Sequence, residues 1–184
     1  MDLQAMLAYC GYLIWLLAGT GDFACHRRTD LPRTSGVAES FAHLLQLALL
    51  GGAIFVWLAF EVGRDALLMM AACVVVHAVV GYRDTRIAFA RRRVVSPIEQ
   101  HLHSVLDMAP FIAFGWIAWT AWPVHGEPGL TLRTPALPAW TWIAILLPAI
   151  VLVVVPAMME FRSALRVRAQ VDPVLGERSR EGGH

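Results

Sequence analysis

Long apolar segments alternate with short polar connections along the chain. Five of these segments are each long enough to cross a hydrocarbon core of about 30 Å, which takes about 20 helical residues. They lie at residues 3–26, 37–62, 66–90, 97–122 and 140–160. Pro148 and Pro156 are expected to kink the last one. The pattern predicts an all-α fold, an integral membrane helical bundle of about five transmembrane helices with a four-helix core.

The composition agrees with a membrane protein. Of 184 residues, 58% are hydrophobic and 16% are charged, and the mean hydropathy is +0.58. These values differ from those of ordinary soluble domains. The first segment lacks the basic start and cleavage pattern of a signal peptide, so we expect it to be retained as a span. We treat residues 1–170 as one transmembrane domain and residues 171–184 as a polar C-terminal tail.

The charges are distributed unevenly between the two ends of the predicted bundle. All 15 basic side chains are Arg. All but Arg64 and Arg133 lie in the first connection, at the end of the third segment and in the connection after it, or after residue 160. The positive-inside rule predicts a multi-pass protein of the inner (plasma) membrane, with the N-terminus outside and the C-terminus in the cytoplasm. We assign the run from Arg91 to Arg93 to this topology and to anionic lipids, or to docking of an acidic electron donor.

The fourth segment begins with SPIEQHLHSVLDMAP, which carries two acids and two histidines into an apolar helix. Glu99, His103 and Asp107 follow one another at intervals of four residues and share one helix face, while His101 lies off that face. A carboxylate and an imidazole one turn apart suit a buried metal site or a proton relay. Asp107 is a candidate proton relay, outer partner of a histidine, or further ligand.

Three other segments bring similar pairs to the same predicted end of the bundle. These pairs are Asp22 and His26, Glu39 and His43, and His77 and Asp84, which join Glu99 and His103 of the fourth segment. The antiparallel order predicts a shallow layer and a deeper layer. The shallow layer holds His26, Glu39, Asp84 and Glu99, and the deeper one holds Asp22, His43, His77 and His103.

Each pair also has a simpler interpretation. Asp22 and His26 lie at a helix end where charged groups reach water. Glu39 could only complement the helix dipole, and Asp84 could only pair with a neighbouring arginine. A carboxylate at the bilayer centre costs about 2.5 to 3.5 kcal/mol, however, so several together need compensation. Arginine or a bound cation could supply it.

The set resembles the ligand inventory of ferritin-like di-iron bundles, which use two Glu and two ExxH pairs, and that of histidine-rich membrane desaturases and hydroxylases. It differs in its D/ExxxH spacing and in lacking an HxxHH box. The resemblance implies two divalent transition-metal ions, iron first and zinc or manganese as alternatives. The predicted metal ligands are Asp22, His26, Glu39, His43, His77, Asp84, Glu99 and His103, and the predicted catalytic residues are Asp22 and Asp107.

These expectations define a membrane-embedded metal-dependent enzyme. The first prediction is a di-iron oxidoreductase of the hydroxylase, desaturase or oxidase type, acting on a lipid or hydrophobic small molecule at the cytoplasmic side. Its partners would be membrane lipid, a cytoplasmic electron donor and another copy of the chain through the fifth segment, with no nucleic acid. The alternatives are a zinc-dependent lipid hydrolase and a transporter of protons or divalent metal. Haem binding and a purely structural subunit are further ones.

Overall fold

The computed structural model describes residues 3–122 and 129–181. These residues form long helices joined by short connections, which confirms the predicted all-α fold class. The helices are α1 (Leu3–Arg28), α2 (Gly36–Ala59), α3 (Arg64–Ala90), α4 (Pro97–Thr120), α5 (Ala139–Ala149) and α6 (Val155–Glu181). A 3-10 turn, η1 (Leu31–Arg33), lies between α1 and α2, and a π-helical turn, η2 (Ile150–Val154), joins α5 to α6.

Within the described residues, five helices are long and apolar enough to cross a membrane by length and composition, as predicted. They are α1, α2, α3, α4 and the continuous helix Ala139–Gln170. Most of their large apolar side chains face outward, and few are buried inside the bundle. This arrangement suits a lipid surround. The orientation across the membrane stays a prediction.

The last helix is longer than the predicted span. It continues past residue 160 through the expected polar tail to Glu181. The segment FRSALRVRAQ that follows Glu160 is rich in Ala, Leu, Arg and Gln, which favour helix regardless of polarity. Charge therefore ends the apolar stretch here but does not end the helix.

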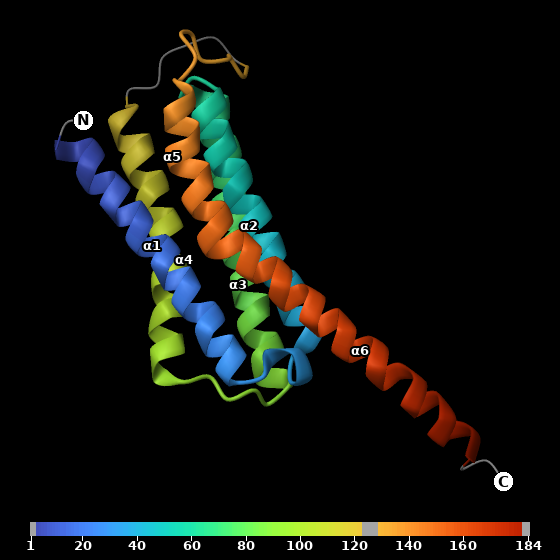
Figure 1. Ribbon diagram of the computed structural model, residues 1–184. Helices are drawn as coiled ribbons and strands as arrows, with labels where there is room; N and C mark the ends of the chain where they lie inside the picture. The colour runs from blue at the N-terminus through green and yellow to red at the C-terminus, as the bar shows by residue number, and fades with distance from the viewer. Residues whose placement is uncertain (1–2, 123–128, 182–184) are drawn as a thin grey trace.

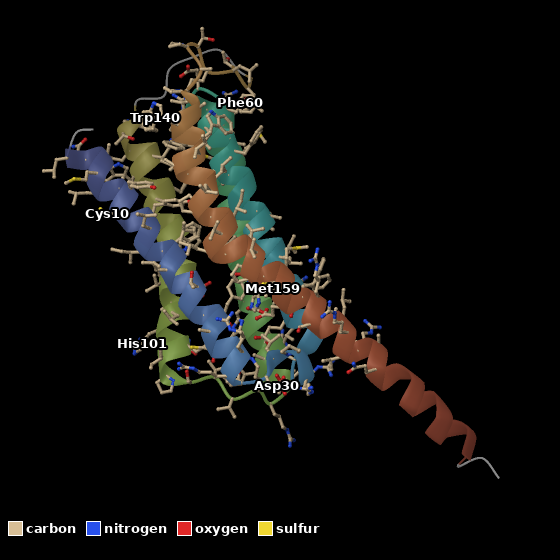
Figure 2. All side chains as sticks on the ribbon, in the orientation of Figure 1. Cys10, Asp30, Phe60, His101, Trp140 and Met159 are labelled. Atoms are coloured by element: carbon tan, nitrogen blue, oxygen red, sulfur yellow. The ribbon has the colours of Figure 1, made fainter. Side chains whose placement is uncertain are left out.

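The helices form a bundle with two distinct ends. Antiparallel α2 and α3 pack along their length, α4 packs against α1 and α3, and α6 crosses α2 (Figure 1). Figure 2 shows Asp30 at the end where α1 finishes, and Phe60 at the opposite end. Beyond the Asp30 end, α6 projects away from the other helices (Figure 1).

The predicted kink between α5 and α6 coincides with the π-helical turn, where the helix axis changes direction (Figure 1). Proline has no N–H, so Pro148 and Pro156 leave the carbonyls four residues earlier without their helical donors. The hydroxyl of Tyr9 donates to the first of these, Ala144, at 3.1 Å, and Thr20 donates to the second, Leu152, at 3.0 Å. Helix α1 thus supplies the missing donors, which an apolar environment demands.

A glycine sets how closely α1 approaches this turn. A Cβ added to Gly19 would lie 2.8 Å from Cγ1 of Val153, far inside ordinary contact distance. Val153 belongs to a buried cluster with Leu16 and Phe23 of α1. The close crossing therefore requires a residue without a side chain on α1.

We predict that Gly19→Leu destabilises the protein by about 1 to 3 kcal/mol, because added carbons overpack this crossing. Gly11→Leu is the matched control, since no other atom lies within 4 Å of a Cβ added there. Thermal unfolding in detergent measures both variants. Equal melting temperatures for the two variants would contradict the packing argument.

Candidate metal centre

Ionisable side chains from all five long helices meet at the end of the bundle where α1 finishes and α4 begins (Figure 2). Each of them is buried or half-buried. They are Asp22, His26, Glu39, His43, His77, Asp84, Glu99, His103, Asp107 and Glu160, with Arg93 from the connection between α3 and α4. Figure 2 shows His101 on the outer side of α4, as its position off the shared face predicts.

His26 lies at the centre of this cluster and is completely buried. Its Nε2 is 3.3 Å from Oδ2 of Asp22, one helical turn earlier on α1, and 3.6 Å from Oε1 of Glu99. Its ring stacks on that of His43, with centroids 4.7 Å apart and planes 8° from parallel. The predicted shallow and deep layers are therefore in direct contact.

Glu160 of α6 joins the two stacked histidines. Its Oε2 is 2.9 Å from Nδ1 of His26, and its Oε1 is 2.9 Å from Nδ1 of His43. Glu160 is absent from the predicted ligands because the fifth apolar segment contains no earlier acid or base. Its position at the end of that segment, on the side where the predicted topology places the other pairs, was the available signal.

Asp84 of α3 contacts the opposite edge of His43. The Nε2 of His43 is 3.1 Å from Oδ2 of Asp84, so this imidazole lies between two carboxylates. Arg83 and Arg86, the alternative partners, are exposed. The interfacial ion pair considered for Asp84 is thus replaced by an internal contact.

His103 of α4 completes the first of two candidate donor groups. Its Nε2 is 3.0 Å from Oδ1 of Asp22. Asp22, His26, Glu99 and His103 can each offer an atom within 4.8 Å of the others, and the same holds for His26, Glu39 and His43. Such spacing fits donors that share an ion. His77 belongs to neither of these groups.

Arg93 enters the cluster because of how α3 ends. Arg92 adopts a left-handed conformation with φ 54°, and the N–H of Arg93 donates to the carbonyl of Ala88 at 3.0 Å. This Schellman-type turn reverses the chain. Arg93 is then only 6% exposed, although it is one of three consecutive arginines. The assignment of the whole run to topology and lipid contact is therefore wrong for Arg93.

The guanidinium of Arg93 pairs with two carboxylates. Its Nη2 is 2.6 Å from Oε1 of Glu39 and its Nη1 is 2.5 Å from Oε1 of Glu99, while Nη1 also donates to Oγ1 of Thr29 at 3.2 Å. Burial alone would lower the pKa of Arg93, but Glu39 and Glu99 raise it above its ordinary value. The side chain therefore stays charged.

Glu99 has a second role at the start of α4. Its backbone N–H donates to Oγ of Ser96 at 3.2 Å, and its Oε2 accepts from the backbone N–H of Ser96 at 3.3 Å. This reciprocal pair is a capping box. It orients Glu99 Oε1 toward His26 and Arg93.

A cavity of about 80 Å³ lies directly beside the donor groups. Its polar wall includes His77, Asp84 and Asp107. Its apolar wall is formed by side chains of α1, α2, α4 and η2. Gly81 makes room for Asp107, whose Oδ1 is 3.0 Å from the position of a Cβ at Gly81. Nδ1 of His77 has no hydrogen-bond partner among the described residues.

The charges of this end of the bundle are out of balance within the described residues. Six carboxyl groups are opposed by a single buried guanidinium, that of Arg93. The carboxyl groups belong to Asp22, Glu39, Asp84, Glu99, Asp107 and Glu160. Protonated histidines or bound cations must supply the remaining positive charge, because unpaired buried charges are very costly.

Comparison of the chain with protein families, curated proteins and solved structures yields no match. Function is consequently inferred from the site itself.

We predict that Glu160→Ala destabilises the fold by about 2 to 5 kcal/mol, because it removes the acceptor of two buried imidazoles. The neighbouring Met159→Ala is the control, since Met159 is 65% exposed. Chemical unfolding of both variants gives the difference in the free energy of unfolding. A Glu160→Ala protein as stable as Met159→Ala would show that the bridge contributes little.

Proposed function

We propose that the protein is a membrane-embedded, metal-dependent oxidoreductase that acts on a lipid or another hydrophobic molecule. The observation that carries the proposal is the buried donor group Asp22, His26, Glu99 and His103, which borders a cavity with a largely apolar wall. Metal and substrate would thus meet inside the bundle. Lipid-soluble substrates would reach it from the membrane.

The spacing of the donor atoms supports a metal. Ligands about 2.1 Å from an ion stand about 3 to 3.5 Å from one another. The contacts of Asp22 with His26 and His103, at 3.3 and 3.0 Å, fall in this range. The group contains two histidines and two carboxylates. Two histidines and one carboxylate are enough for a non-haem iron site that leaves positions open for reactants.

Charge balance is compatible with divalent ions as a source of positive charge, beside protonated histidines. One buried arginine faces six carboxyl groups among the described residues. Two divalent cations would bring the cluster close to neutrality with neutral histidines. Glu39 and His43 of the second donor group, beside His26, would hold the second ion.

The reaction we favour is oxidation by dioxygen at an iron centre. In a hydroxylation, one oxygen atom enters a C–H bond of the substrate, and the other leaves as water with two electrons and two protons from a reduced donor. Asp107 lines the cavity and could carry such protons. Exposed Arg91 and Arg92 lie beside the site for an acidic electron donor. With zinc instead, the same ligands would support hydrolysis of a lipid ester or amide.

A specific contact chain favours proton transfer as a second candidate. His26, Glu160, His43 and Asp84 follow one another through contacts of 2.9, 2.9 and 3.1 Å. Imidazoles alternating with carboxylates can pass a proton along such a chain. Proton flux into liposomes that Glu160→Gln abolishes, in protein without bound metal, would favour a transporter over an enzyme.

We predict about one to two transition-metal ions per chain in protein purified without chelators, measured by elemental analysis. His103→Ala should lower metal affinity at least about tenfold, because it removes a donor. His101→Ala should leave affinity unchanged, since His101 is exposed and lies outside the donor groups. Metal-free wild-type protein, or equal affinity in the two variants, would refute the metal centre.

We also predict that a fluorescent protein fused after His184 fluoresces in the cytoplasm of cells, because arginines concentrate near the donor groups. An alkaline phosphatase fused at the same position should be inactive there. The opposite pair of results would place the site on the outer face of the membrane.

A further inference from the structure

The two donor groups share His26 but differ in their relation to Arg93. Arg93 holds both oxygens of Glu39, with Nη2 2.6 Å from Oε1 and Nε donating to Oε2 at 3.2 Å. This is a two-point contact between a planar guanidinium and a carboxylate. Glu39 is completely buried, and the guanidinium faces both of its oxygens, so an ion placed beside them would meet the positive charge of Arg93.

Glu99 is held differently. Arg93 contacts only its Oε1, at 2.5 Å, while Oε2 accepts from Ser96. A carboxylate oxygen has two lone pairs, so Oε1 can face Arg93 and still serve an ion beside His26. The group of Asp22, His26, Glu99 and His103 is thus compatible with Arg93 in place.

Arg93 reaches Glu39 from a connection, not from a helix. Its backbone follows the left-handed Arg92 and precedes the extended N-cap Ser96 of α4. A connection can change conformation without unfolding the helices that it joins. Removal of the guanidinium from the cluster would leave Glu39 as a bare carboxylate beside His26 and His43.

We infer that Arg93 occupies the place of a second metal ion, so that the closed form binds one ion at Asp22, His26, Glu99 and His103. A second ion binds at Glu39 and His43, beside His26, only when the connection between α3 and α4 withdraws Arg93. The inference depends on the proposed metal centre and adds how its second position is controlled. Until that ion binds, the guanidinium of Arg93 compensates the negative charge of Glu39 and Glu99.

The experiment is a titration of metal-free protein with cobalt(II) alone, followed by visible absorption and elemental analysis after dialysis. Wild-type protein should retain about one ion per chain. Arg93→Gln should retain about two, because it frees Glu39 and removes the competing charge. Arg91→Gln is the matched control and should behave as wild type, since Arg91 is exposed and has an ordinary backbone conformation.

A double variant tests whether the extra ion uses Glu39. Arg93→Gln combined with Glu39→Gln should return to about one ion per chain, with the visible spectrum of the wild type. Arg93→Lys serves if Arg93→Gln does not fold. It keeps a positive charge but cannot hold both oxygens of Glu39, so second-ion affinity should rise at least about tenfold over wild type.

The outcomes separate this inference from the proposed function. Wild-type protein that already binds two ions overturns the inference while supporting the metal centre. A folded Arg93→Gln or Arg93→Lys protein with wild-type stoichiometry and affinity also overturns it alone. Wild-type protein that binds no cobalt refutes the metal centre and the inference together.

Discussion

Buried negative charge is the constraint on which the rest of the structure depends. Carboxyl groups gathered in an apolar bundle need positive partners, since their burial is otherwise too costly. Several contacts compensate this negative charge. Arg93 turns inward to Glu39, and His43 contacts both Glu160 and Asp84. Glu99 contributes to a helix cap with one oxygen and to the cluster with the other. The cap of helix α4 and the polar centre are therefore stabilised by the same carboxylate.

The backbone near the prolines of the last long helix also contains polar groups that need partners. Prolines remove donors, and hydroxyl groups of α1 supply replacements, at Ala144 by Tyr9 and at Leu152 by Thr20. In lipid such carbonyls would otherwise lack partners. These bonds fix α1 against α5 and η2, and so bring Glu160 to His26. The polar centre thus depends on helix irregularities outside its own set of ionisable residues.

Span positions, fold class and the set of acids and histidines could be predicted because membrane thickness and charge cost act on sequence directly. Helical spacing also correctly placed His101 outside the cluster. The roles of Arg93 and Glu160 could not be found this way. Arg93 is distinguished from its neighbours only by a left-handed residue before it, and a run of arginines carries no such information. Glu160 is recruited by a helix crossing that depends on tertiary packing, with Gly19 at its closest point.

Helix α6 gives the buried centre a mechanical connection to distant regions. From Glu160 the helix continues through Pro173 and Gly176 to Glu181, an arm with a length of about 30 Å at 1.5 Å per residue. A helix transmits displacement along its axis, so a force applied to the far end of this arm would act on the carboxylate that holds the two stacked histidines together. Whatever engages that arm would be able to pull on the centre without entering it.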